Sequence, residues 1–122
     1  MKIRIKGNSL RMRLSKPEVK LLAKEGYIEE RTEFINGTLI YAVKSIGGER
    51  LSADFLEGSI TLYVPVHLLQ QWASTNLVGL DDNMPLHNGS ALYLLIEKDF
   101  KCIDADVNED QSDYFENPLK AC

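Results

Sequence analysis

The sequence has no long hydrophobic run. Its longest, at residues 91–96, contains six residues, whereas a membrane-spanning helix needs about 20. The opening residues 1–6 alternate between charged and apolar side chains and lack the apolar core of a secretory signal. We therefore expect a soluble protein with no membrane segment or export signal, located in the cytoplasm.

Cysteine and catalytic motifs are also scarce. The two cysteines, Cys102 and Cys122, do not form a disulfide framework in a chain large enough to build its own core, which is consistent with a reducing compartment. Together with His67 and His87 they show neither C-x-x-C nor H-x-x-x-H spacing, so no zinc site is predicted. The sequence has no G-x-S-x-G or G-x-x-x-x-G-K pattern and therefore predicts no catalytic triad or P-loop. No cofactor is predicted, and the motifs favour a protein that is not an enzyme.

One acidic pattern has the spacing of a calcium-binding loop. Residues 104–110 read D-x-D-x-N-x-D, which matches the first four ligand positions. Glu109 stands where the loop requires glycine, and Phe115 stands where it requires glutamate. We interpret the pattern as part of a solvated acidic segment and predict no metal site.

The composition is that of a globular protein. Hydrophobic residues make up 44% and charged residues 26% of the 122 positions, as in an ordinary single domain. We predict one globular domain over residues 1–100. The acidic residues 101–122 would form a C-terminal segment that is partly disordered or packed on the domain.

Period-2 alternation and capping residues place the first elements. Residues 2–6 and 10–14 predict a hairpin, and Ser15 with Glu18 three positions later predicts a capped helix that ends before Gly26. Asn36-Gly37 is the strongest hairpin signal, between strands 27–35 and 38–46.

The second half of the chain continues in the same manner. Strands 51–57 and 59–64 complete a meander of four, a helix follows Pro65 over residues 66–75, and strands are expected at 77–80 and 91–97. No internal repeat is apparent. The sequence predicts an α+β fold, ββ-α-ββββ-α-ββ, with one mostly antiparallel sheet of seven or eight strands packed against two helices, and a barrel-like closure as one option. The predicted core is Ile3, Ile5, Met12, Leu14, Leu22, Tyr41, Val43, Phe55, Leu62, Val64, Leu69, Trp72, Leu92, Leu94 and Ile96.

Charge is unevenly distributed along the chain. The formal net charge is −4, which argues against a generally basic nucleic-acid-binding protein. Residues 1–13 nevertheless carry five basic side chains and no acidic one, whereas residues 97–122 carry eight acidic side chains and three lysines. We call the five basic residues the basic hairpin face: Lys2, Arg4, Lys6, Arg11 and Arg13.

The expected hairpin register brings these charges together. If Ile3 and Met12 share a buried face, a register with position sums of 17 sets Lys6 opposite Arg11 and Arg4 opposite Arg13. Like charges in such pairs are unfavourable by about 0.2–1 kcal/mol each. Three sources of negative charge could neutralise these cations: acids on neighbouring strands, the chain's own acidic C-terminal segment, or an external anion. The first is the commonest arrangement in proteins. The acids in question are Glu29, Glu30, Glu33, Asp54 and Glu57.

Several segments resemble a known family. They are M-K-I-R-I-x-x-N-S-L-R-x-R at residues 1–13, Val78-Gly79 after Trp72, I-E-K-D-F-x-C at residues 96–102, and Asn117-Pro118 in the acidic tail. Together they resemble a family of small bacterial proteins of unknown function, which implies a single soluble domain and supplies no activity, cofactor or catalytic residue. The alternating basic strands are also loosely similar to the CYTH-type triphosphate tunnel enzymes, but the E-x-E-x-K start is missing and the chain is short for a closed tunnel.

The sequence supports two functional hypotheses. The first is a small binding module whose basic hairpin face takes an anionic small molecule or an acidic protein segment. The alternative is a metal-dependent phosphoryl-transfer or phosphate-hydrolysing enzyme, in which the same basic residues hold phosphate and Glu29, Glu30, Glu33 or Asp54 holds a divalent metal. A partner docked on a sheet edge, including a second copy in a homodimer, is a further option.

Overall fold

The computed structural model describes residues 1–100. Within them it contains two helices and eight strands, which confirms the α+β class. In chain order the elements are β1 (Lys2–Ile5), β2 (Ser9–Leu14), α1 (Lys16–Glu25), β3 (Tyr27–Phe34), β4 (Gly37–Ile46), β5 (Ser52–Leu56), β6 (Ser59–Pro65), α2 (Val66–Ser74), β7 (Gly79–Pro85) and β8 (Ala91–Lys98). The C-terminal segment 101–122, with both cysteines and the D-x-D-x-N-x-D pattern, lies outside the described residues.

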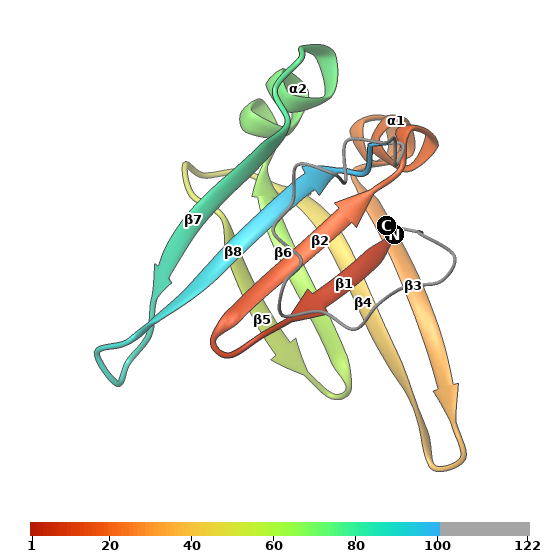
Figure 1. Cartoon of the computed structure of the whole chain (residues 1–122), viewed down its shortest axis with the longest axis vertical. Helices are drawn as coiled ribbons and strands as arrows, with labels where there is room; N and C mark the ends of the chain where they lie inside the picture. The colour runs from red at the N-terminus through yellow and green to blue at the C-terminus, as the bar shows by residue number, and fades with distance from the viewer. Residues whose placement is uncertain (101–122) are drawn as a thin grey trace, which may run out of the picture.

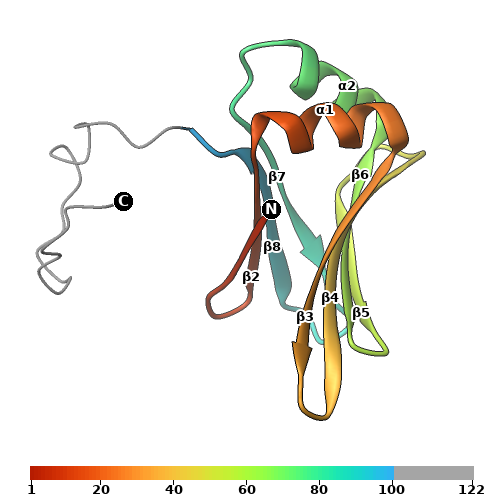
Figure 2. The same cartoon turned by 90° about the vertical axis from the view of Figure 1, so that its right-hand side faces the viewer.

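The strands form two sheets rather than one, so the single-sheet prediction is wrong. Sheet A has the order β1-β2-β8-β7 and sheet B the order β3-β4-β6-β5, and the eight strands do not close into a barrel. The two sheets face each other, with both helices at one end of the sandwich (Figures 1 and 2). Side chains from the inner faces of the two sheets pack together in one common core.

The predicted four-strand meander is also wrong at its centre. Strands β4 and β5 are joined by a short connection but do not pair; instead β6 lies beside β4 and runs parallel to it. In sheet A, β2 and β8 are likewise parallel. A short connection favours antiparallel pairing only when the chain folds straight back, and here it carries β5 to the outer edge of sheet B.

The structure contains a repeat that the sequence does not reveal. The unit ββαββ occurs twice, as β1-β2-α1-β3-β4 and β5-β6-α2-β7-β8. The pairing of Lys2 with Arg13 in the first unit recurs as that of Ser52 with Tyr63, 50 positions later. Each sheet combines the first hairpin of one unit with the second hairpin of the other. The chain is thus a pseudo-symmetric pair of interlocked units.

Local chemistry explains the elements that were predicted correctly. The Ser15 N–H donates to Glu18 Oε1 at 2.8 Å, which is half of the expected capping box of α1. Gly26 ends the helix in the left-handed region, with φ of 78°, and its N–H donates to the Leu22 carbonyl. A hairpin joins β3 to β4 as predicted, but its turn is one residue earlier: Ile35 and Asn36 form the turn, and Gly37 opens β4 opposite Phe34.

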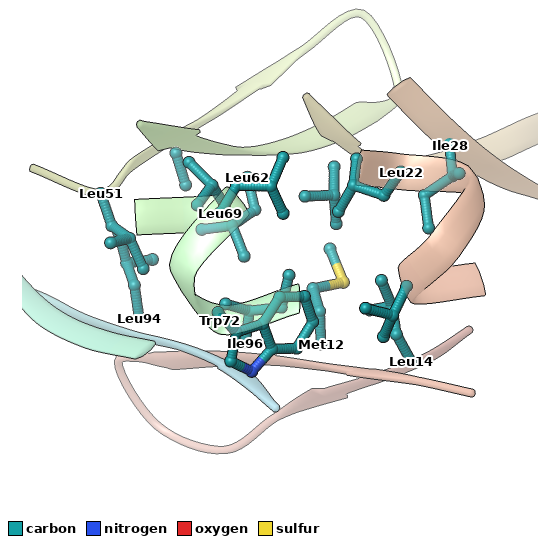
Figure 3. Packing of buried hydrophobic residues seen from close by; sticks show 14 of the residues in the cluster. Met12, Leu14, Leu22, Ile28, Leu51, Leu62, Leu69, Trp72, Leu94 and Ile96 are labelled. Atoms are coloured by element: carbon teal, nitrogen blue, oxygen red, sulfur yellow. The ribbon is translucent and has the colours of Figure 1, made fainter. Parts of the chain in front are cut away.

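The core lies between the two sheets and includes side chains from both helices (Figure 3). Met12 and Ile96 from sheet A, Val43 and Leu62 from sheet B, and Trp72 from α2 are all 0% exposed. The Trp72 indole N–H donates to the Val78 carbonyl at 2.9 Å, so the ring is buried without an unsatisfied donor.

Two predicted core residues are exposed. Ile5 is 60% and Phe55 is 69% accessible. They occupy equivalent positions in the two units, near the ends of β1 and β5 that lead into the hairpin turns. Alternation assigned both side chains to the inner face correctly, but the core does not extend to that end.

Strand β7 is longer than the predicted 77–80 segment and contains acids that the sequence assigned to a loop. Its first residue, Gly79, packs so closely on β8 that an added Cβ would come within 2.8 Å of the Ile96 carbonyl oxygen. Neither helix in residues 1–100 is long and apolar enough to cross a membrane.

Candidate functional site

The basic hairpin face is built by β1 and β2. Ile3 lies opposite Met12 on the inner side, so the alternating basic side chains all point outward from sheet A. The predicted register is wrong by one step of two residues: Arg4 faces Arg11, and Lys2 faces Arg13.

The turn explains the different register. Ser9 begins β2 instead of belonging to the turn, and the Lys6 N–H donates to the Ser9 carbonyl at 3.4 Å. The Ser9 hydroxyl donates to the Lys6 carbonyl at 2.7 Å. Only Gly7 and Asn8 remain in the loop, with Gly7 at φ of 56°, so Lys6 is placed beside the turn rather than opposite Arg11.

Four of the five basic residues line one surface pocket. Its volume is about 280 Å³, and its lining consists of Lys2, Ile3, Arg4, Arg11, Arg13 and Glu97. We call it the basic pocket. Lys6 does not line it. The lining therefore combines four cationic residues and one acidic residue with Ile3, whose side chain points to the inner side of the sheet.

Two of the four cations have acidic partners among residues 1–100. Arg13 donates through Nε and Nη2 to Glu97 Oε1, at 3.1 and 2.9 Å. Lys2 Nζ lies 3.1 Å from Asp99 Oδ2. Both acids follow from the parallel pairing of β8 with β2, which the sequence could not reveal.

Arg4 and Arg11 remain without a carboxylate partner inside residues 1–100. The guanidinium of Arg11 lies 5.9 Å from the centre of the Tyr93 ring, within the range of a cation–π contact. The Tyr93 hydroxyl donates to Asp81 Oδ2 at 3.0 Å. Burial and this hydrogen bond raise the pKa of Tyr93, so the ring remains neutral beside Arg11.

The acids expected to neutralise the basic face lie elsewhere. Glu29, Glu30, Glu33, Asp54 and Glu57 all belong to the strands and turns of sheet B. Glu29 accepts hydrogen bonds from Tyr27 and Arg31, and Glu30 accepts one from the Met1 amine. None of them lines the basic pocket. Acids of the folded domain therefore do neutralise part of the basic hairpin face, but they are Glu97 and Asp99 instead of the five predicted ones. Among residues 1–100 they pair only with Arg13 and Lys2.

The acids proposed as metal ligands in the enzyme hypothesis do not form one site. Glu29 and Glu33 point outward from sheet B, whereas Glu30 points inward, so the structure does not bring these three together. Asp54 accepts a hydrogen bond from Tyr63 at 3.0 Å. In the described part of the chain, no group of three His, Cys, Asp or Glu side chains is arranged to hold a metal ion.

The equivalent hairpin of the second unit has no cluster of basic residues. The positions equivalent to Lys2, Arg4, Arg11 and Arg13 are Ser52, Asp54, Thr61 and Tyr63. Hairpin β5-β6 pairs in the same register as β1-β2 without any of these cations. The fold alone therefore does not require a cluster of guanidinium groups at this position.

The arrangement can bind an oxyanion. Two guanidinium groups on directly opposite residues present planar forks of N–H donors, which match the geometry of phosphate and carboxylate oxygens. Glu97 keeps Arg13 in place at one side of the pocket, and Tyr93 supports Arg11.

Comparison with known proteins gives one match. The model of a family described as a family of unknown function (DUF7009) covers residues 1–119. No curated protein and no solved structure matches the chain.

Proposed function

The chain belongs to this family of unknown function, and we propose from its geometry that the basic hairpin face binds a small anionic ligand. The residues that would contact it are Arg4 and Arg11, with Lys2 and Arg13 beside them and Lys6 at the rim. The protein would act as a binding module.

One observation supports this proposal above the others. Arg4 and Arg11 lie opposite each other in one pocket and have no carboxylate partner within residues 1–100. Like charges placed so closely disfavour the folded state unless an anion lies between them. Since the equivalent hairpin of the second unit lacks the cations, the cost serves a purpose other than folding.

The pocket favours a small ligand. Its volume of about 280 Å³ lies at the lower limit of ordinary small-molecule sites. Pyrophosphate offers several oxygens to two guanidinium forks and is small enough for this space. It is therefore the best first probe.

Thermal unfolding of the full chain at low ionic strength tests the proposal. A ligand that binds only the folded state stabilises it by about 2.7 kcal/mol at 100 times its Kd. We expect pyrophosphate to raise the Tm of the wild-type protein by several degrees. The rise should shrink in 0.5 M NaCl, because exposed charges are screened.

Matched variants locate the site. The pair Arg4→Ser and Arg11→Thr should weaken pyrophosphate binding at least tenfold. The control pair Lys20→Gln and Lys44→Thr removes the same charge from exposed positions on α1 and β4 and should leave binding unchanged. Equal losses in both pairs, or no Tm shift with phosphate, pyrophosphate or nucleotides, would refute a specific anion site.

A further inference from the structure

Strand β1 is an edge strand of sheet A in the part of the chain that the structure describes. It pairs only with β2 among the described residues. Because Lys6 and Ser9 exchange a backbone hydrogen bond and antiparallel pairs alternate, the N–H groups of Ile3 and Ile5 point away from β2. An edge with such groups free can accept another strand.

The exposed edge has a distinct two-sided pattern. Lys2 and Arg4 point outward from the sheet, and Ile3 and Ile5 point inward. A strand that fits this edge would carry acidic residues at every second position and apolar residues between them.

The chain itself contains such a sequence. Residues 103–107 read I-D-A-D-V, with Asp104 and Asp106 alternating with three apolar residues. This is the period-2 complement of K-I-R-I-K at residues 2–6. The pattern that failed as a calcium loop therefore has a simpler explanation in charge complementarity.

The described part of the chain ends close to the start of β1. The Asp99 N–H donates to the Leu14 carbonyl at 2.8 Å, and the Asp99 carboxylate pairs with Lys2. Asp99 lies in line with β8, so a new position outside β1 is three strand spacings away, or about 14 Å. The four residue steps from Asp99 to residue 103 reach about 14 Å when fully extended.

We propose that residues 103–107 of this chain bind along the free edge of β1, with Asp104 and Asp106 facing Lys2 and Arg4. The segment would run parallel to β1 and extend sheet A. It would also place two carboxylates beside the basic pocket, where they compete with an external anion. The competition rests on the proposed function, whereas binding of the segment to the edge does not.

Hydrogen exchange of the full chain tests the segment directly. The amides of Ile3 and Ile5 should exchange at least tenfold more slowly than the amide of Phe55, which is equivalent to Ile5 on the edge strand of sheet B. The variant with Asp104→Asn and Asp106→Asn should lose this protection. The control with Glu109→Gln and Asp113→Asn removes the same charge from positions off the alternating pattern and should keep it.

Two results would overturn the proposal. One is exchange of Ile3 and Ile5 as fast as that of Phe55 in the wild-type protein. The other is protection that grows with protein concentration alongside a dimer mass, because the occupant would then come from a second copy.

Pyrophosphate titration separates this proposal from the proposed function. If both hold, the Asp104→Asn and Asp106→Asn variant binds pyrophosphate several-fold more tightly than wild type. If Ile3 and Ile5 are protected but no variant binds pyrophosphate, the edge proposal stands and the anion site is wrong.

Discussion

The α-amine of Met1 is held by two carboxylates, Glu18 and Glu30, the latter at 3.2 Å. Burial lowers the pKa of the amine, but hydrogen bonds to the two carboxylates outweigh it and raise the pKa above its ordinary value of 8.0. Burial raises the pKa of Glu18, but its bonds to the amine and to Ser15 outweigh that and lower the pKa below 4.5. In the second unit Arg50 and Asp82 form the comparable ion pair, at 2.6 and 3.0 Å.

These pKa directions predict how Glu18→Gln changes the dependence of stability on pH. The contribution of the amine to the free energy of unfolding is complete below about pH 8. It is lost as the pH rises through the raised pKa of the amine in the folded state. The contribution of Glu18 to the free energy of unfolding is complete above about pH 4.5. It is lost as the pH falls through the lowered pKa of Glu18 in the folded state. The variant keeps an acceptor for the Ser15 N–H, so it removes mainly charge.

We expect Glu18→Gln to lower the free energy of unfolding by about 1 kcal/mol between pH 4.5 and 8. Urea titrations at several pH values measure this difference, which should fade outside that window. Glu25→Gln, an exposed acid on the same helix, serves as the control. A loss of equal size at every pH would show that the ion pair is not its cause.

At the scale of elements, hairpin β1-β2 carries a charge conflict that hairpin β5-β6 avoids. Arg4 faces Arg11 in the first hairpin, whereas Asp54 faces Thr61 at the equivalent position. Direct opposition of like charges costs about 0.2–1 kcal/mol. The two hairpins thus give an internal comparison of the same backbone with and without the conflict.

In the variant with Asp104→Asn and Asp106→Asn, which removes the proposed partner of Arg4, the further change Arg4→Ser should therefore stabilise the ligand-free protein slightly. We expect the free energy of unfolding to rise by a few tenths of a kcal/mol up to about 1 kcal/mol at low salt. The gain should shrink in 0.5 M NaCl. Arg13→Ser, which breaks the pair with Glu97, should show no such gain. Denaturant titration measures both changes in this variant, and a loss of stability on Arg4→Ser would mean that Arg4 has a negative partner other than Asp104 and Asp106.

For the whole molecule, the exchange of hairpins between units has a consequence for folding. Sheet A needs β1-β2 from the first unit and β7-β8 from the second, and sheet B needs the converse. Neither unit can complete a sheet or bury the shared core by itself. The protein should behave as one cooperative structure.

We predict a single unfolding transition. The only tryptophan, Trp72, lies fully buried in the core, so its fluorescence reports core packing. Far-UV circular dichroism reports both sheets and both helices. The two signals should have coincident midpoints in urea. Separate midpoints would show that part of the structure unfolds independently.

The sequence predicts the basic residues of the candidate site but not the residues that neighbour them. The five basic residues follow from alternation in residues 1–14, and four of them share one pocket. Glu97, Asp99 and Tyr93 could not be predicted as their neighbours, because they come from a strand more than 80 positions away that pairs in parallel with β2. No local pattern encodes a contact of that kind.

The amino-acid sequence by itself determined the local elements. Caps at Ser15 and Gly26, the hairpin between β3 and β4 and period-2 alternation depend on residues a few positions apart, so they can be identified in any context, although the turn of that hairpin lies one residue earlier than predicted. Only the tertiary structure decided how the strands divide into two sheets, which partners each cation has, and that the chain repeats itself. Those outcomes depend on which distant faces bury each other, and many sequences with the same alternation satisfy that condition in different ways.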